Sequence, residues 1–269
     1  MSMLKGKTAL VTGSTSGIGL GIAIALARQG ANIVLNGFGD VEAPRAQVLD
    51  AGKAAGIQVG YHGADMSKTA DIEAMMKYAA AEFGRVDILV NNAGIQHVAK
   101  VQDFPVEKWD AILAINLSSA FHTTRLALPA MQQANWGRII NVASVHGLVG
   151  SAEKSAYVAA KHGIVGLTKV TALENAASGV TCNAICPGWV TTPMADEEMQ
   201  PLMDAQGISL EQAYQQVCRD VPLRRPASAQ EIALACQFLC SPQASIISGA
   251  TLVADGGASA VDVPTLAFA

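Results

Sequence analysis

Short aliphatic runs alternate with longer stretches of helical periodicity along most of the chain. The predicted strands are Thr8–Val11, Asn32–Leu35, Gln58–Tyr61, Ile88–Val90, Gly137–Val142 and Thr181–Ile185. The predicted helices are Ile18–Arg28, Ala43–Ala55, Ile72–Phe83, Val106–Leu117, Phe121–Gln133 and Lys154–Ala177. Continuous aliphatic strands are typical of parallel sheets covered on both faces. The alternation therefore predicts one α/β domain over residues 1–269, a doubly wound parallel sheet with helices on both faces.

The segment from Thr191 to Leu223 interrupts this rhythm. It is polar, rich in Met and Gln, and contains Pro193 and Pro222 near its ends. A late insertion of this kind is often a cover for a substrate, so we expect a small helical lid and call residues 191–223 the lid segment. An irregular surface excursion is the alternative. The apolar tail Val261–Ala269 is expected to dock on its own domain or on a neighbouring subunit.

Composition narrows the classes of function. Hydrophobic residues make up 51% of the chain, which allows a sizeable core, and the formal net charge is −4 without a basic run. Nucleic acids and anionic membranes are therefore poor candidate partners. No signal-peptide pattern or membrane-length apolar run is visible, so a cytoplasmic location is expected. The five cysteines include no C-x-x-C pair, which favours buried thiols over a metal or disulfide framework.

A glycine-rich turn follows the first predicted strand and opens the first helix. Its spacing is G-x-x-x-G-x-G, and its candidate cofactor-binding residues are Gly13, Thr15, Ser16, Gly17, Ile18 and Gly19. Glycines allow the backbone to approach a ligand closely, and the free N–H groups at a helix N-terminus attract a pyrophosphate. A turn chosen only for packing would explain one glycine more easily than three.

The end of the second strand bears on the choice of dinucleotide. Residues 36–40, with Phe38 at the expected adenosine contact, contain neither Lys nor Arg, and none occurs in Ser14–Ser16. A 2′-phosphate would have no cationic partner there, which favours NAD over NADP. Asp65, after the third strand, is expected to accept a hydrogen bond from adenine, unless it only caps the next helix.

Further motifs identify the family. Their residues are Asn92-Ala93-Gly94 after the fourth strand, Asn116, Ser144, Tyr157 with Lys161, and Pro187-Gly188. With the glycine turn, they arrive in an order that resembles the short-chain dehydrogenase/reductase family. The resemblance implies a Rossmann-type fold, a metal-free site and a homotetramer. It also implies that Asn116 holds a water through which Lys161 relays a proton, and that Val190 and Thr192 contact the cofactor beside Pro187 and Gly188.

The proton-transfer chemistry can be argued from the residues themselves. Tyr157 and Lys161 are four residues apart, so on a helix they share one face. A free tyrosine has a pKa of about 10 and is a poor base near neutrality. We expect the Lys161 ammonium and the positive nicotinamide to lower that pKa, and Ser144 to donate a hydrogen bond to the reacting oxygen. An isolated Y-x-x-x-K pair would more often be a solvated surface pair.

Three polar residues, Gln96, His146 and Lys154, lie close in sequence to these motifs. One cation with two neutral donors suits a carboxylate, because burying an anion without partners is costly. The set resembles family members that oxidise small 3-hydroxy acids with NAD, which implies a carboxylate clamp walled by Trp189. Taken singly, Lys154 could be an exposed helix-start lysine and His146 a loop histidine.

The lid segment departs from that pattern. The resembling members carry a glutamine near the substrate, whereas this chain has Asp196, Glu197 and Glu198, with Gln200 nearby. Glu198 is expected to repel a substrate carboxylate unless it points away or is protonated, and Gln200 is considered as a substitute for the missing glutamine. The alternative functions are a 3-oxoacyl-thioester reductase, a sugar or polyol dehydrogenase, or a non-catalytic NAD-sensing protein.

Overall fold

A parallel sheet of seven strands forms the centre of the computed structural model, which describes residues 2–262. The strand order is β3-β2-β1-β4-β5-β6-β9, and every neighbouring pair runs parallel. The strands are β1 Thr8–Val11, β2 Asn32–Leu35, β3 Val59–Tyr61, β4 Ile88–Asn91, β5 Gly137–Val142, β6 Val180–Pro187 and β9 Thr251–Ala254. The order reverses between β1 and β4, so the crevice at their carboxyl ends is the expected ligand position.

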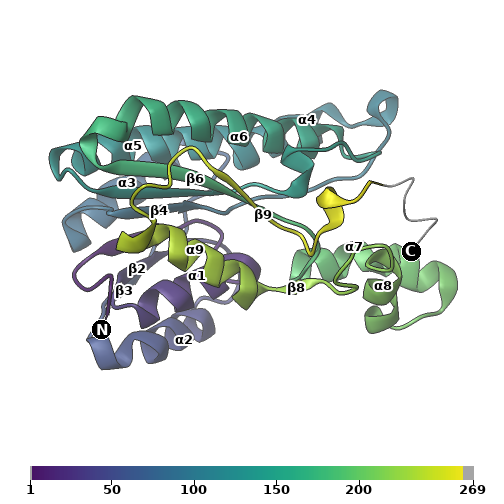
Figure 1. Ribbon diagram of the computed structural model, residues 1–269, viewed down its shortest axis with the longest axis horizontal. Helices are drawn as coiled ribbons and strands as arrows, with labels where there is room; N and C mark the ends of the chain where they lie inside the picture. Colours follow the sequence, from purple (N-terminus) through teal and green to yellow (C-terminus); the bar gives the residue numbers. More distant parts are fainter. Residues whose placement is uncertain (1, 263–269) are drawn as a thin grey trace.

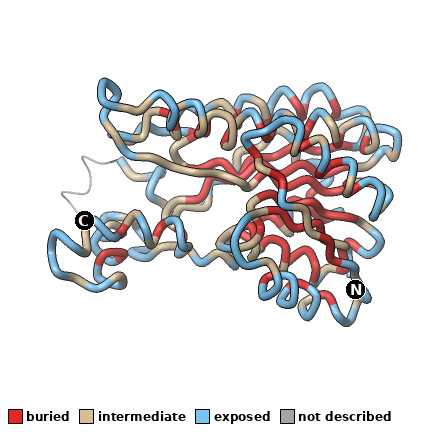
Figure 2. Tube along the Cα trace, turned by 180° about the vertical axis from the view of Figure 1, so that it is seen from behind, coloured by how far each residue is buried: buried red, intermediate tan, exposed pale blue. Residues whose placement is uncertain are grey.

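Helices cover both faces of the sheet (Figure 1). One face carries α1 Gly17–Arg28, α2 Glu42–Gly52 and α9 Ala229–Cys240; the other carries α3 Thr69–Phe83, α4 Val106–Leu113, α5 Ser119–Gln133 and α6 Ser155–Asn175. The central strands β1, β4, β5 and β6 are buried along their whole lengths, as the red trace in Figure 2 shows. The expected doubly wound, Rossmann-type architecture is therefore confirmed.

The structure differs from the predicted elements in one helix end and in two elements that were not predicted. The helix expected over Val106–Leu117 ends at Leu113 and continues through a π-helical turn at Ala114–Ser118 before α5 begins. Neither α9 nor β9 was expected. The helix α9 begins with a capping box, in which Ser228 and Glu231 satisfy each other's backbone N–H groups.

The lid segment is mostly helical, so the alternative of an irregular excursion is wrong. The segment begins at the end of β7 Val190–Thr191 and contains α7 Pro193–Gln206 and α8 Leu210–Val217. The strand β7 pairs with β8 Ala227–Ser228. Thr192 caps α7 and Ser209 caps α8 through backbone N–H groups. The two helices lie beyond the carboxyl edge of the sheet (Figure 1), and their shared apolar cluster includes Trp189.

Several predictions concern the rest of the chain. All five cysteines are free and buried, as expected. Within residues 2–262, no helix is both long and apolar enough to cross a bilayer. Most of the tail Val261–Ala269 lies outside the described residues.

Candidate active site

The glycine-rich turn brings backbone close to the N-terminus of α1. Gly13 and Gly17 adopt positive φ angles of 61° and 54°, a region that side-chain-bearing residues rarely occupy. A Cβ on Gly13 would lie 2.9 Å from Ala93 Cα, and one on Gly17 would lie 3.3 Å from Thr192 Cγ2. These glycines therefore let the turn, the Asn-Ala-Gly loop and the start of the lid segment converge.

The N-terminus of α1 is suited to an anion. Its N-cap residue Ser16 makes no side-chain capping hydrogen bond, and its first turn carries no acidic residue. In contrast, the side chains of Thr192, Ser209 and Ser228 cap α7, α8 and α9. Uncapped N–H groups and the positive end of the helix dipole fit a dinucleotide pyrophosphate.

Asn36 holds the turn against the next two strands. Its Oδ1 accepts from Gly13 N at 3.3 Å, and its Nδ2 donates to the carbonyls of His62 and Ala64, each at 3.0 Å. The side chain is buried and its hydrogen-bonding groups are engaged. Asn36 is therefore a structural amide, a role that the sequence alone did not reveal.

The surroundings of the expected ribose position carry no cation at residues 36–40. Phe38 is 66% exposed, and its carbonyl accepts from Thr15 Oγ1 at 3.0 Å. Asp40 accepts from Glu42 N at 3.0 Å at the start of α2.

Thr12 joins the glycine turn to the Asn-Ala-Gly loop. Its hydroxyl accepts from the backbone N–H groups of Asn92 and Ala93, at 2.9 and 3.0 Å. The Asn92 amide donates in turn to the carbonyls of Thr12 and Gly13, both at 2.9 Å. The Asn92 side chain therefore fixes the backbone of the glycine turn. Gly94 lies close to Asn116, because a Cβ on Gly94 would be 3.5 Å from Asn116 Oδ1.

Asp65 makes local contacts at the start of α3. Its carboxylate accepts from Ser67 N at 2.9 Å and Ser67 Oγ at 2.7 Å, and it pairs with Lys68 at 3.2 Å. These hydrogen bonds, with Ser67 foremost, lower the pKa of Asp65. The carboxylate therefore orders the turn before α3 but does not cap the helix, whose N-cap residue Lys68 has no side-chain capping hydrogen bond, and contact with adenine stays a prediction.

Tyr157, Lys161 and Ser144 meet at the carboxyl end of β5. Lys161 Nζ lies 5.4 Å from the Tyr157 ring centroid and donates to the Val142 carbonyl at 2.7 Å. Lys161 is buried, and desolvation lowers its pKa to about 8. The Ser144 hydroxyl accepts from His146 N at 3.2 Å. The expected convergence of the motif residues is present.

The predicted lowering of the Tyr157 pKa by Lys161 and a positive nicotinamide together stays a prediction, because the protein alone does not lower that pKa. Desolvation raises the pKa of Tyr157 to about 12, although a hydrogen bond with Ser144 opposes the increase. The Glu198 carboxylate raises it further. Lys161 donates to the Val142 carbonyl, so its ammonium acts on the phenol through space and not through a direct hydrogen bond. The positive charge of an oxidised nicotinamide would favour the phenolate further.

Asn116 lies in the π-helical turn at Ala114–Ser118 and is buried. Its carboxamide is engaged by a neighbouring backbone: Oδ1 accepts from Ile95 N and Nδ2 donates to the Ile95 carbonyl, each at 2.9 Å. The side chain therefore positions the loop that carries Gln96. Because the side chain is engaged, the predicted water would have to bind the main chain of Asn116. This main chain belongs to a π-helical turn, a type of turn that is frequent at functional sites.

The end of β6 approaches β9 closely. Pro187 pairs with Ala254, and Gly188 N donates to the Ala254 carbonyl at 3.1 Å. A Cβ on Gly188 would lie 3.0 Å from Asp255 Cα. Val190, the next predicted cofactor residue, is buried.

The three predicted clamp residues lie on adjoining loops. A β-bridge joins Ala99 to Lys154, and Ala99 N donates to the Glu153 carbonyl at 2.9 Å, so the loop carrying Gln96 is tied to the start of α6. The Gln96 Nε2 atom is buried without a hydrogen-bond partner. A buried orphan donor is unusual and suits a missing ligand.

His146 contacts the catalytic motif. Its ring lies 6.0 Å from that of Tyr157 in an edge-to-face arrangement. Burial lowers the pKa of His146, and the Lys154 ammonium lowers it further. The imidazole is therefore neutral near pH 7, which matches the predicted combination of one cation with neutral donors.

Lys154 is not an exposed helix-start lysine. Its side chain is 13% exposed, and Nζ lies 2.8 Å from Glu198 Oε2 and 5.5 Å from the Trp189 ring centroid. The expectation that Glu198 only repels a substrate carboxylate is thus incomplete. Glu198 forms an ion pair with Lys154, the residue predicted to bind that carboxylate. Sequence reasoning missed this contact, which joins α7 to the start of α6.

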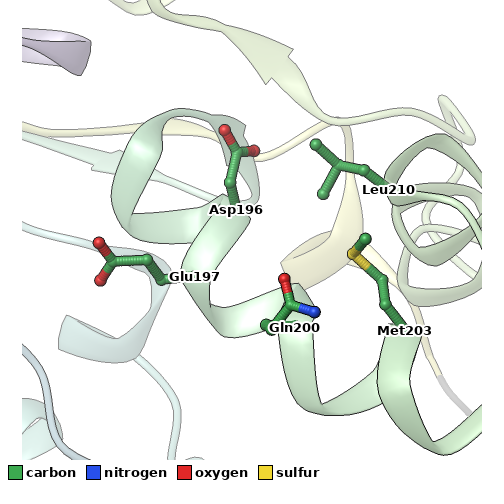
Figure 3. A pocket seen from close by; sticks show the side chains of 5 residues that line it. All are labelled: Asp196, Glu197, Gln200, Met203 and Leu210. Atoms are coloured by element: carbon green, nitrogen blue, oxygen red, sulfur yellow. The ribbon is translucent and has the colours of Figure 1, made fainter.

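A separate hollow of about 450 Å³ lies in the lid segment. It is lined by Asp196, Glu197, Gln200, Met203 and Leu210. Figure 3 shows Leu210 and Met203 on one side and Glu197 pointing away from them. Asp196 accepts from Tyr214 OH at 2.7 Å, which fastens α7 to α8. Gln200 donates to Asp204 at 2.7 Å, so it does not replace the expected glutamine near Lys154.

Comparisons with known proteins agree with the geometry. The family model described as short chain dehydrogenase matches residues 7–202. The chain is 63% identical over 256 residues to "D-beta-hydroxybutyrate dehydrogenase" of Cupriavidus necator, covering 95% of this chain and 98% of that protein. It is 51% identical over 252 residues to the protein of the same name from Rhizobium meliloti, covering 93% and 98%. The crystal structure of an actinorhodin polyketide ketoreductase with NADPH has a TM-score of 0.86 and 35% identity, covering 95% and 98%.

Proposed function

This chain belongs to the short-chain dehydrogenase family, and we propose that it transfers a hydride between NAD and a small 3-hydroxy acid. The specific reaction proposed is the conversion of D-3-hydroxybutyrate to acetoacetate, the substrate named by its relatives. The observation that carries the substrate class is the buried, unpartnered Gln96 Nε2 on the loop tied to Lys154. An amide donor, a neutral imidazole and an ammonium together match one carboxylate.

The proposed chemistry divides between proton and hydride. Tyr157 takes the proton from the C3 hydroxyl, while Ser144 donates a hydrogen bond to the same oxygen as it becomes a carbonyl. Bound NAD would supply the acceptor for the hydride that leaves C3, together with a positive charge that favours the Tyr157 phenolate. Lys161 adds a second charge 5.4 Å from the ring and, by the proposed relay through a water at Asn116, returns the proton to solvent.

The proposed cofactor is NAD rather than NADP. The uncapped N-terminus of α1 supports a pyrophosphate site, and the lack of a cation at residues 36–40 argues against a 2′-phosphate. We further propose that the dinucleotide is contacted by the residues that the family resemblance implies: Gly13, Thr15, Ser16, Gly17, Ile18, Gly19, Phe38, Asp65, Asn92, Ala93, Gly94, Tyr157, Lys161, Pro187, Gly188, Val190 and Thr192.

The proposed assembly is a cytoplasmic homotetramer of single-domain subunits. Large apolar side chains are exposed on α5, α6, α9 and β9, among them Phe121, Leu173, Phe238 and Val253. Apolar surface of this extent supports burial against other copies. Light scattering on the purified protein tests the subunit number.

A substrate panel tests the function. The purified protein is mixed with NAD or NADP and D-3-hydroxybutyrate, its L-enantiomer, 3-hydroxyvalerate, a polyol or a 3-hydroxyacyl thioester, and the reduced nicotinamide is followed by absorbance. Preference for NAD with the D-hydroxy acid is expected. Preference for the thioester or polyol would replace the proposal with one of those activities, and binding of NAD without any turnover would favour a sensor.

A further inference from the structure

Glu198 forms an ion pair with Lys154, the cation that the proposed substrate carboxylate requires. Its Oε2 lies 2.8 Å from Lys154 Nζ, and the two side chains are only 21% and 13% exposed. At this distance the pair forms a charge-assisted hydrogen bond. A second carboxylate that approaches Lys154 therefore has to compete with one that belongs to the chain.

We propose that Glu198 is a specificity-determining residue, an internal carboxylate that an acid substrate must displace from Lys154. The inference rests on the proposed function, because it concerns the same carboxylate clamp. The exchange replaces one carboxylate by another on the same ammonium. No buried charge is left without a partner at its end, which is the condition for such an exchange to be inexpensive.

The surroundings of Lys154 favour this exchange. The Trp189 ring, 5.5 Å from Nζ, attracts the ammonium whichever carboxylate is bound. The unpartnered Gln96 Nε2, on the loop that the Ala99–Lys154 bridge ties to the start of α6, is the proposed donor for the incoming acid. The displaced Glu198 side chain is partly exposed already, so it can return to water as the substrate arrives.

The neighbouring lid residues do not hold Lys154 in the same way. Asp196 is engaged by the Tyr214 hydroxyl at 2.7 Å, on a different part of α7. Glu197 follows it, is exposed, and forms no ion pair within residues 2–262. The competition is therefore specific to Glu198, and Glu197 offers a matched control with the same charge one residue away.

The exchange lowers the affinity for acids selectively. An acid binds only after the Lys154–Glu198 pair is broken, whereas an uncharged hydroxy compound leaves the pair in place. Glu198→Gln keeps the side-chain size but removes the competing charge. We expect it to lower KM for D-3-hydroxybutyrate about tenfold, more than a fully exposed ion pair would allow because the pair is partly buried.

The experiment compares wild type, Glu198→Gln and Glu197→Gln. For each, kcat and KM are measured with D-3-hydroxybutyrate and with neutral 3-hydroxybutyramide at a pH where kcat is constant. Butyrate, which has the carboxylate but no hydroxyl, is titrated calorimetrically in the presence of NAD. Circular dichroism verifies that each variant is folded, and Glu198→Ala serves as a second variant if the glutamine protein is not.

The expected result is a lower KM for the acid and a lower Kd for butyrate in Glu198→Gln alone, with KM for the amide unchanged. Equal values in the two variants would overturn the proposal, as would weaker butyrate binding in Glu198→Gln, which would make Glu198 a contributor to binding. If wild type does not oxidise D-3-hydroxybutyrate, the proposed function fails, and the butyrate titration alone decides the exchange.

Discussion

Lys161 donates its hydrogen bond to the Val142 carbonyl at 2.7 Å and not to the phenol of Tyr157. This contact fixes the ammonium at the end of β5, where it acts on Tyr157 only through space. Because desolvation raises the pKa of Tyr157 to about 12, the proposed proton abstraction would be favoured by the positive charge of a bound oxidised nicotinamide. The proposed mechanism therefore predicts that substrate oxidation and cofactor binding are coupled through this phenol.

Removal of the phenol should separate binding from chemistry. Tyr157→Phe is expected to lower kcat at least about a hundredfold, because the general base is lost, and to leave NAD affinity nearly unchanged. Steady-state rates and calorimetric NAD titration measure the two quantities. Retention of most of the turnover would show that another group takes the proton.

Lys154→Ala should damage the use of acids selectively. Loss of a charge-assisted contact is expected to lower kcat/KM for D-3-hydroxybutyrate about tenfold to a hundredfold, with a much smaller effect on 3-hydroxybutyramide. Both are measured under identical NAD saturation. An equal loss on both substrates would mean that Lys154 supports the site structurally and does not bind the carboxylate.

The pH dependence of oxidation should report the charge of Glu198. Desolvation is the main cause of the raised Tyr157 pKa, and the Glu198 carboxylate raises it further. Glu198→Gln removes that negative charge, so the pKa falls and the phenolate forms at lower pH. The acid limb of log kcat/KM against pH should move to lower pH than in wild type. A limb that stays in place would exclude an electrostatic effect of Glu198 on the phenol.

Asn36 should matter more for stability than an ordinary surface amide. Asn36→Asp replaces the donor to the His62 and Ala64 carbonyls by an acceptor, in a buried position. We expect the free energy of unfolding to fall by about 2–4 kcal/mol, measured by urea denaturation. Asn32→Asp is the control, since Asn32 only accepts, from Gln58 N. Equal effects of the two changes would contradict the structural role of Asn36.

The capping box of α9 predicts a stability that depends on acid. Hydrogen bonds from Arg225 and Ser228 lower the pKa of Glu231 from 4.5 to about 2. Because the folded pKa is below the unfolded one, the stabilisation is complete above pH 4.5 and disappears as pH falls toward 2. Glu231→Gln should lower Tm by about 3 °C at pH 7.

The Tm difference between Glu231→Gln and wild type should also shrink on acidification. Glu211→Gln, in the first turn of α8, controls for the loss of a surface charge. A difference that is constant between pH 7 and pH 3 would exclude the carboxylate as its origin.

The first half of the fold follows from local signals. The strand before Gly13 and the helix after Gly17 were predictable, since aliphatic runs and a glycine turn mark their ends. The helix α9 escaped prediction although Ser228 and Glu231 form a readable capping box, because the lid segment before it obscured the alternation. The strand β9 is short and half-exposed, so its pattern is weak.

Long-range contacts set the limits for the site. The sequence could align Tyr157 with Lys161 on one helix face, but the depth of burial and the choice of the Val142 carbonyl are tertiary properties. The pairing of Lys154 with Glu198 depends on how α7 docks, which no local pattern encodes. Asn36 could not be recognised as a structural amide, because its partners lie in the glycine turn and in the loop after β3, far away in the sequence.

The bridge between Ala99 and Lys154 has one more consequence. The bridge ties the loop that carries Gln96 to the start of α6, so the two proposed carboxylate donors, Gln96 and Lys154, would be held together and an acid that binds between them would require little loop ordering. Shortening or lengthening either segment would shift both side chains at once. Changes of chain-length preference should therefore arise from residues that line the cavity, and seldom from insertions in these two loops.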